Sequence, residues 1–276
     1  MDKLTDKFAP VSVVIPCFRC VDTISRAVAS VANQTLVPFE VILVDDCSGD
    51  GTLELLCAIA KKYPHDWVKI LQLPVNSGPS VARNKGWNHA TQPYIAFLDA
   101  DDSWHPLKLK LQVEALLADP SIALIAHQMN VQQPDAPAPA LCGQLKSQIV
   151  RPHTLMFTNP FPTPAVVLSR ELPFRFDENR RRVEDFFLWA QIIFSGHKCV
   201  KINQVLASCH KPTFGAGGLS GDMTAMHDAA IDVIKELRVS GLFSWWEAYI
   251  TMGVSRIKRI RRQVIVKWRR MALVSK

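Results

Sequence analysis

The sequence lacks long apolar segments and has no secretory signal. No uncharged apolar run reaches about 18 residues, the length that a membrane-spanning helix needs. Residues 1–10 are largely polar and lack the apolar core of a signal peptide. These absences predict a protein that neither crosses a membrane nor is exported.

The seven cysteines are odd in number and scattered, so they form no disulfide framework. Cys17 and Cys20 form a lone C-x-x-C without the second pair that a zinc site of this kind uses. Such cysteine usage fits a reducing compartment, and we expect a cytoplasmic protein.

Acidic residues are missing from one end of the chain. Residues 253–276 contain nine Lys or Arg and no Asp or Glu, whereas the rest of the chain has 23 basic and 25 acidic side chains. The net charge of +7 therefore comes entirely from this segment.

The same end carries an apolar stripe at helical spacing, with most of the basic residues off it. The stripe consists of Trp246, Tyr249, Ile250, Gly253, Ile257, Ile260, Val264 and Trp268. A basic amphipathic helix with aromatic residues is typical of contact with an anionic membrane surface. The alternative is a helix packed on its own domain with a solvated basic face. Nucleic acid is disfavoured as a partner because no aromatic-studded strand or recognition helix accompanies the charge.

The first half of the chain alternates between strand and helix patterns. Strands are predicted at residues 11–15, 39–44, 68–73, 94–98 and 122–126, and helices at 22–31, 50–60, 78–90 and 106–118. Short connections between them predict an α/β fold with a mostly parallel sheet covered by helices on both faces. Beyond residue 131 the regularity stops, with a Pro- and Ala-rich loop at 132–144, a helix at 183–194 and a glycine-rich loop at 215–221.

Carboxylates follow two of the predicted strands, at the sheet edge where ligands of such folds bind. Asp45 and Asp46 follow the second strand, and Asp99, Asp101 and Asp102 follow the fourth. Asp99 and Asp101 are two residues apart and point to the same side if the strand continues. Their mutual repulsion requires a cation, and oxygen ligands favour Mg²⁺ or Mn²⁺. The alternative is an acidic loop that caps the helix beginning near Pro106.

Four stretches together resemble family 2 of the inverting glycosyltransferases, which have the GT-A fold. They are V-S-V-V-I-P-C-F-R-C with S-V-A-N-Q-T, F-E-V-I-L-V-D-D-C-S-G-D-G-T, N-S-G-P-S-V-A-R-N-K-G leading into F-L-D-A-D-D, and V-E-D-F-F-L-W. The likeness covers residues 10–220 and implies a GT-A domain over 1–225, with a nucleotide-binding half to about residue 130 and an acceptor side over 131–225. Residues 226–276 then form a basic amphipathic helical extension.

The resemblance also implies which residues bind the nucleotide. Asp45 and Asp46 match the aspartates that hold the base, and Pro16 and Cys17 match the turn lining the base pocket. Arg83 matches the arginine near the base and diphosphate. From the residues alone, the aspartates could instead cap a loop or helix, and Arg83 could be an exposed helix residue paired with a carboxylate.

For the reaction itself, the resemblance assigns Asp99 to the ribose and Asp101 to a divalent metal, Mn²⁺ or Mg²⁺, at the diphosphate. Asp185 matches the general base, and Glu184 beside it is assigned to acceptor binding. From the residues alone, Glu184 and Asp185 could equally be acids at a helix N-terminus.

Two further residues, His210 and Lys211, match a segment that approaches the diphosphate. In this family, Tyr-Asn often follows the proline turn, where this chain has Phe18 and Arg19.

The expected function is an inverting transfer of a hexose or N-acetylhexosamine from a UDP-sugar to a hydroxyl of a lipid-linked or polysaccharide acceptor. The basic helix would hold the enzyme at the inner face of the membrane. The alternative is a non-catalytic nucleotide-sugar-binding protein on the same fold. A dinucleotide-dependent dehydrogenase is excluded because no G-x-G-x-x-G follows the first strand, and residues 16–20 are not the glycine-rich phosphate loop of a nucleotidyltransferase.

Overall fold

The computed structural model describes residues 8–64, 66–134, 136–211 and 222–274, and all their side chains except those of residues 223, 262, 263 and 265–274. The glycine-rich loop predicted at 215–221 and the side chain of Trp268 in the predicted stripe lie outside this description. Within it, the strands form a nine-stranded sheet in the order β3-β2-β1-β4-β8-β6-β9-β5, with β7 paired to β9. The strands are β1 (Phe8–Cys17), β2 (Val37–Asp45), β3 (Val68–Gln72), β4 (Tyr94–Phe97), β5 (Asp102–Trp104), β6 (Ile122–Val131), β7 (Ser147–Ile149), β8 (Val167–Ser169) and β9 (Lys198–Cys209).

The sheet is parallel where the sequence alternates strand and helix, and mixed beyond. β1 pairs in parallel with β2 and β4, and β2 with β3. β8 runs antiparallel between β4 and β6, while β5 and β7 run antiparallel to β9. The predicted α/β class with a mostly parallel sheet is confirmed. The three-residue strands β5, β7 and β8 are too short to show a periodic pattern in the sequence.

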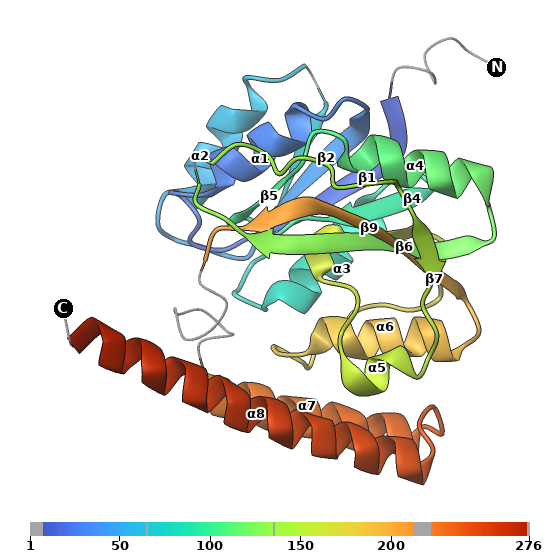
Figure 1. Ribbon diagram of the computed structural model, residues 1–276. Coiled ribbons are helices and arrows are strands. Elements are labelled where there is room, and N and C mark those ends of the chain that lie inside the picture. The colour runs from blue at the N-terminus through green and yellow to red at the C-terminus, as the bar shows by residue number, and fades with distance from the viewer. Residues whose placement is uncertain (1–7, 65, 135, 212–221, 275–276) are drawn as a thin grey trace.

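Helices cover both faces of the sheet (Figure 1). They are α1 (Ile24–Ala32), α2 (Thr52–Ala60), α3 (Pro79–His89), α4 (Lys108–Ala118), α5 (Thr154–Phe157), α6 (Glu184–Phe194), α7 (Met223–Val239) and α8 (Trp245–Val274), with a 3₁₀ turn at Thr163–Ala165. α1, α2 and α4 bury their apolar stripes in one core layer, and α3, α6 and α7 in the other. Ile24, Ala27, Val28 and Val31 of α1 are fully buried, as their spacing of three and four residues predicts.

Helix α3 lies unusually close to β1. A Cβ atom on Gly86 would lie 2.3 Å from Cγ1 of Val14, so only glycine permits this approach. Arg83 is one turn earlier on the same helix. The contact therefore determines how near this arginine comes to the carboxyl end of the sheet.

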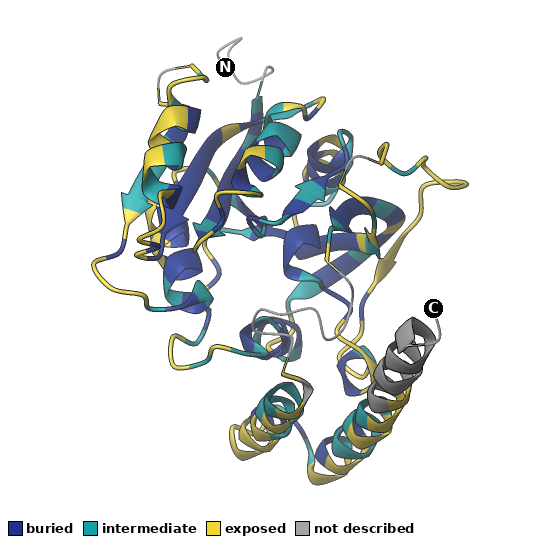
Figure 2. Ribbon diagram, turned by 90° about the vertical axis from the view of Figure 1, so that its left-hand side faces the viewer, coloured by how far each residue is buried: buried dark blue, intermediate teal, exposed yellow. Residues whose placement is uncertain are grey.

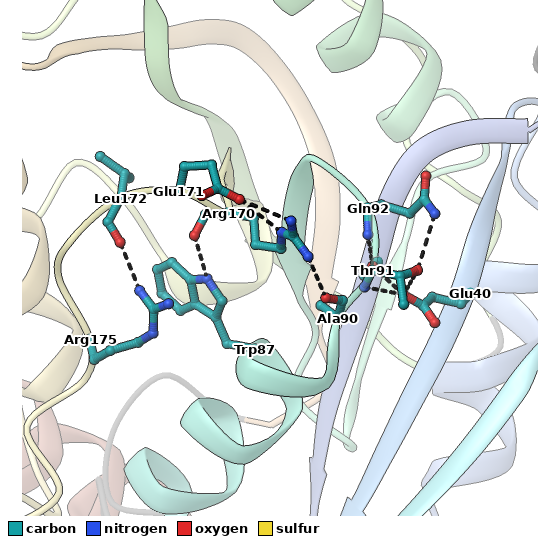
Figure 3. A network of polar contacts seen from close by, with 10 residues as sticks. Glu40, Trp87, Ala90, Thr91, Gln92, Arg170, Glu171, Leu172 and Arg175 are labelled. Atoms are coloured by element: carbon teal, nitrogen blue, oxygen red, sulfur yellow. Dashed lines mark hydrogen bonds and ion pairs between the residues drawn. The ribbon is translucent and has the colours of Figure 1, made fainter.

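A polar network centred on the buried side chains of Trp87 and Glu40 anchors the far end of α3 and the segment before β4 (Figure 3). Trp87 Nε1 donates to the carbonyl of Arg170, and the Arg170 guanidinium donates to the carbonyl of Ala90. Glu40 accepts bonds of 2.7 Å from both the backbone N–H and the hydroxyl of Thr91, and it also accepts from Ser12 and Lys69. This network holds in place the two elements that carry Arg83 and Asp99.

The two C-terminal helices run side by side and pack on α5 and α6 (Figure 1). Val233, Ile234 and Leu237 of α7 and Ala248 of α8 are buried in the same core layer as α6. The outer faces of both helices are exposed (Figure 2). In the described part of the chain, no helix is both long enough and apolar enough to span a bilayer.

The hydrogen bonds to Glu40 predict a specific acid sensitivity. Burial by itself would raise the pKa of Glu40, but the bonds from Lys69, Ser12 and Thr91 outweigh it and lower the pKa. A carboxyl whose pKa is lower when folded stabilises the protein above its unfolded pKa of about 4.3, and this contribution is lost as the pH falls. We expect Glu40→Gln to lower the free energy of unfolding at pH 7 by about 2 kcal/mol and to flatten its decline between pH 6 and pH 3.

Urea titrations over this pH range measure both effects. The control is Glu171→Gln, in the same region (Figure 3), whose side chain is 77% exposed and pairs with Arg170. An exposed ion pair of this kind contributes at most about 1 kcal/mol to the free energy of unfolding. Equal losses for the two variants would show that burial of Glu40 has no special effect.

Candidate active site

The largest cavity near the predicted site lies at the carboxyl ends of β1, β2 and β4. Its volume is about 640 Å³, within the range of small-molecule sites. Its walls come from the turn after β1, the start of α3, the segment after β4 and the end of β9; they include Pro16, Cys17, Asp46, Asn76, Gly78, Arg83, Asp99, Asp101, Arg181 and Lys211. We call it the donor cavity. Most of the residues predicted to bind nucleotide are therefore brought together.

Of the two aspartates after β2, only Asp46 lines this cavity. Asp46 accepts hydrogen bonds from Asn76 Nδ2, from the backbone N–H of Ser77 at 2.7 Å and from that of Gly78 at 2.8 Å. Asp45 is buried and accepts from the Ser48 hydroxyl at 2.5 Å. Asp46 thus shapes the turn that leads into α3, and Asn76 joins the site as a residue that the sequence analysis did not single out.

Arg83 forms the centre of the site. Its two terminal nitrogens each donate at 2.8 Å, one to Asp99 at the end of β4 and one to Glu184 at the start of α6. Burial alone would lower the pKa of Arg83, but Asp99 and Glu184 raise it, so the guanidinium stays charged. Arg83 is 5% exposed, so it is no surface residue of α3.

The three carboxylates after β4 occupy different environments. Asp99 pairs with Arg83, and Asp101 pairs with Lys211 at 2.5 Å. Asp102 begins β5 and is buried, and burial together with the charges of Asp99 and Asp101 raises its pKa to about 8. None of the three caps α4, whose N-cap is Leu107 without a side-chain hydrogen bond, so the alternative of a helix-capping acidic loop is wrong.

The carboxylate of Asp101, which pairs with Lys211 in the structure, is the kind of oxygen ligand that suits a hard cation such as Mg²⁺ or Mn²⁺. Among the described residues, no group of three His, Cys, Asp or Glu side chains could hold a metal by itself. A site with one or two carboxylates is typical of Mg²⁺ that takes its other ligands from substrate phosphates and water. The residues therefore fit a metal that binds together with a diphosphate.

Helix α6 begins with a strained residue. Val183, its N-cap, has a φ of +60°, a left-handed conformation that is rare for a β-branched residue. The next side chain, Glu184, is held by Arg83 and lines neither cavity described here, although the sequence analysis assigned it to the acceptor.

Asp185 faces a second cavity of about 280 Å³ between α5, α6, α7 and α8. Burial and the neighbouring Glu184 raise the pKa of Asp185 to about 6. Hydrogen bonds from the Phe186 N–H and from Asn159 Nδ2 lower the pKa, but by less. We call this the acceptor-side cavity. Asn159 was not anticipated from the sequence, since an Asn in a proline-rich loop reads as a turn residue.

The structure separates His210 from Lys211. Both ring nitrogens of His210 are hydrogen bonded, one to the Ser103 hydroxyl at 2.8 Å and one to the Gln132 carbonyl at 3.0 Å, and the ring lines a different hollow. Lys211 reaches the donor cavity and pairs with Asp101.

Solved structures with the same fold are glycosyltransferases of the GT-A class. S. aureus TarS 1-349 aligns over 90% of this chain and 71% of that chain, with a TM-score of 0.65 and 22% identity. A mannosyltransferase from Pyrobaculum calidifontis, solved with GDP-Man and Mn2+, aligns over 91% of this chain and 74% of that chain, with a TM-score of 0.64 and 18% identity. The fold class predicted from the sequence is therefore confirmed as GT-A.

The sequence comparisons identify the family. The profile of Glycosyl transferase family 2 matches residues 12–172, which is more than half of the chain, so the chain belongs to that family. The amylovoran biosynthesis glycosyltransferase AmsB of Erwinia amylovora is 30% identical, over 74% of this chain and 71% of its own length. The succinoglycan biosynthesis protein ExoO of Rhizobium meliloti is 32% identical over 70% of this chain, and the match spans 58% of ExoO. The chain is therefore a member of a glycosyltransferase family.

The bridging position of Arg83 leads to a test of stability. Arg83→Met leaves Glu184 buried without a counter-charge, and we expect a loss of about 3 kcal/mol in the free energy of unfolding. The double variant Arg83→Met with Glu184→Leu removes the unpaired charge and should regain at least half of that loss. Urea unfolding measures both.

The control is Arg181→Met, an exposed arginine on the same cavity. It should change stability by less than about 0.5 kcal/mol. Purely additive effects of the Arg83 and Glu184 substitutions would contradict the proposed pairing.

Proposed function

We propose that the protein is an inverting glycosyltransferase in which Asp185 is the general base. The observation that carries this proposal is the placement of Asp185 next to the Arg83–Glu184 pair, facing the acceptor-side cavity. Arg83 itself lines the donor cavity together with Asp99 and Asp101. A base that works by direct displacement must act on the side opposite the leaving group, so the proposal requires that an acceptor hydroxyl held at Asp185 reach the anomeric carbon of a sugar bound in the donor cavity.

A nucleoside diphosphate sugar fits the donor cavity, and we propose a UDP-sugar. TarS, which shares the fold, has been solved with UDP-GlcNAc. Asp46 and the turn at Pro16 and Cys17 would face the base, and Asp99 the ribose. Lys211 and a metal at Asp101 would lie at the diphosphate.

The proposed reaction is one displacement at the anomeric carbon. As the acceptor oxygen forms its bond to that carbon, its proton passes to the Asp185 carboxylate. The bond from the anomeric carbon to the diphosphate oxygen breaks, and its electron pair leaves with the diphosphate. A Mn²⁺ or Mg²⁺ ion bound at Asp101 would neutralise that charge, and Lys211 supplies a second cation there.

We further propose that the enzyme works on a membrane surface and that its acceptor is lipid-linked. Helix α8 packs on the protein through Ala248 and Thr251, which are buried. Its opposite face exposes Trp246, Tyr249, Ile250, Ile257, Ile260 and Val264. One face of this helix therefore packs on the protein. The exposed apolar stripe on the other face supports contact with a surface such as the inner face of the membrane.

Replacing the base should separate catalysis from binding. Asp185→Asn retains the shape and the hydrogen bond from Asn159 but cannot accept the proton. We expect transfer to fall by 10²–10⁴-fold while UDP binding, measured by calorimetry, changes less than about twofold. In the unaltered enzyme, kcat/KM should fall tenfold per pH unit below about pH 6, because Asp185 must be ionised.

Asp228→Asn, an exposed carboxylate on α7, serves as the control and should leave both quantities unchanged. If Asp185→Asn also abolished UDP binding, or if it transferred sugar at the normal rate, the assignment of the base would be wrong.

Metal removal gives an independent test. With EDTA we expect transfer to stop and to return when Mn²⁺ or Mg²⁺ is added, because the ion neutralises the leaving diphosphate. Asp101→Asn should raise the Mn²⁺ concentration needed for half-maximal activity by tenfold or more. The melting curve of the unaltered enzyme in EDTA should match its curve without EDTA, which shows that metal removal does not unfold the protein. Full activity in EDTA would overturn the metal requirement.

A further inference from the structure

The acceptor-side cavity has apolar walls and a basic rim. Leu155, Met156, Phe186, Ile234 and Val254 line it, together with His227, Lys258 and Arg259. Among its described lining residues, Asp185 is the single acid. Its volume of about 280 Å³ suits a small group rather than a lipid chain.

The two cations at this cavity come from consecutive residues of α8. Lys258 Nζ donates to the carbonyl of Phe157 and so ties α8 to the end of α5. Arg259 is half-buried at the cavity, and the structure gives it no ion pair within the described residues. Arginine and lysine are the side chains that bind phosphate groups in proteins, and here both line the same cavity.

The same helix carries the exposed apolar stripe on its other side. Ile257 and Ile260, which flank the two cations in sequence, are 68% and 62% exposed. On an α-helix these residues point away from the face that carries Lys258 and Arg259. Helix α8 therefore lies between the acceptor-side cavity and the surface that the stripe would contact.

We propose that Lys258 and Arg259 bind the phosphates of an acceptor in which a saccharide is joined through a diphosphate to a lipid. The lipid chain stays in the bilayer that the apolar stripe of α8 contacts. The saccharide enters the cavity toward Asp185, and the diphosphate at its base meets the two cations. This inference rests on the proposed function and adds the chemical class of the group by which the acceptor is recognised.

A binding experiment without donor sugar tests the proposal apart from catalysis. The full chain is sedimented with phosphatidylcholine vesicles containing either a polyprenyl diphosphate or phosphatidylglycerol, matched in surface charge. We expect the unaltered protein to bind the diphosphate vesicles at least tenfold more tightly, since each cation near a phosphate contributes about 1 kcal/mol. Lys258→Gln with Arg259→Gln should remove this preference, and Arg259→Gln alone, which keeps the tie to α5, should remove part of it.

The matched control is Arg256→Gln with Arg261→Gln, two exposed arginines of the same helix that do not line the cavity. This variant should bind both vesicle types more weakly by the same factor and keep the preference. Equal binding of the two vesicle types by the unaltered protein, or equal effects of the two double variants, would overturn the proposal.

The vesicle-binding result does not depend on whether Asp185 is the general base. Asp185→Asn is expected to keep the preference for diphosphate vesicles, whether or not it still transfers sugar. Melting curves of every variant confirm that the helices remain folded.

Discussion

The site depends on one buried arginine held between two carboxylates. Arg83 joins Asp99 of the sheet edge to Glu184 of α6, and these residues are far apart in the sequence. The planar guanidinium of Arg83 is itself buried, and its two terminal nitrogens serve both carboxylates at once. The pair therefore brings α6, and with it Asp185, to the edge of the parallel sheet where the nucleotide would bind.

The carboxylates at this edge have different electrostatic surroundings. Asp99 pairs with Arg83 and Asp101 with Lys211, while burial and the charges of these two aspartates raise the pKa of Asp102 to about 8. Asp185 has a pKa of about 6 and is mostly ionised at neutral pH while keeping a higher proton affinity than an exposed aspartate. Such separation of pKa values among neighbouring acids is characteristic of catalytic sites.

The two faces of helix α8 have different surroundings. One face of α8 completes the wall of the acceptor-side cavity and the other exposes apolar side chains. Val183, a β-branched residue with a positive φ, comes directly before Glu184, which pairs with Arg83, and Asp185, which lines the acceptor-side cavity.

The sequence by itself determined the alternating strands and helices of residues 8–131 and the family, because buried parallel strands and their covering helices leave local apolar patterns. It also indicated the acids after β2 and β4. Tertiary structure alone decided that Asp46 rather than Asp45 lines the donor cavity, and that His210 lies outside it. It also decided that Glu184 pairs with Arg83 and that the apolar stripe of α8 stays exposed. These outcomes depend on contacts between residues 30 to 110 positions apart, such as Asp46 with Asn76, Arg83 with Glu184 and Lys211 with Asp101. Local periodicity carries no information about such pairings, because they are set by the crossing of strands in the sheet and by which charges must be neutralised once they are buried.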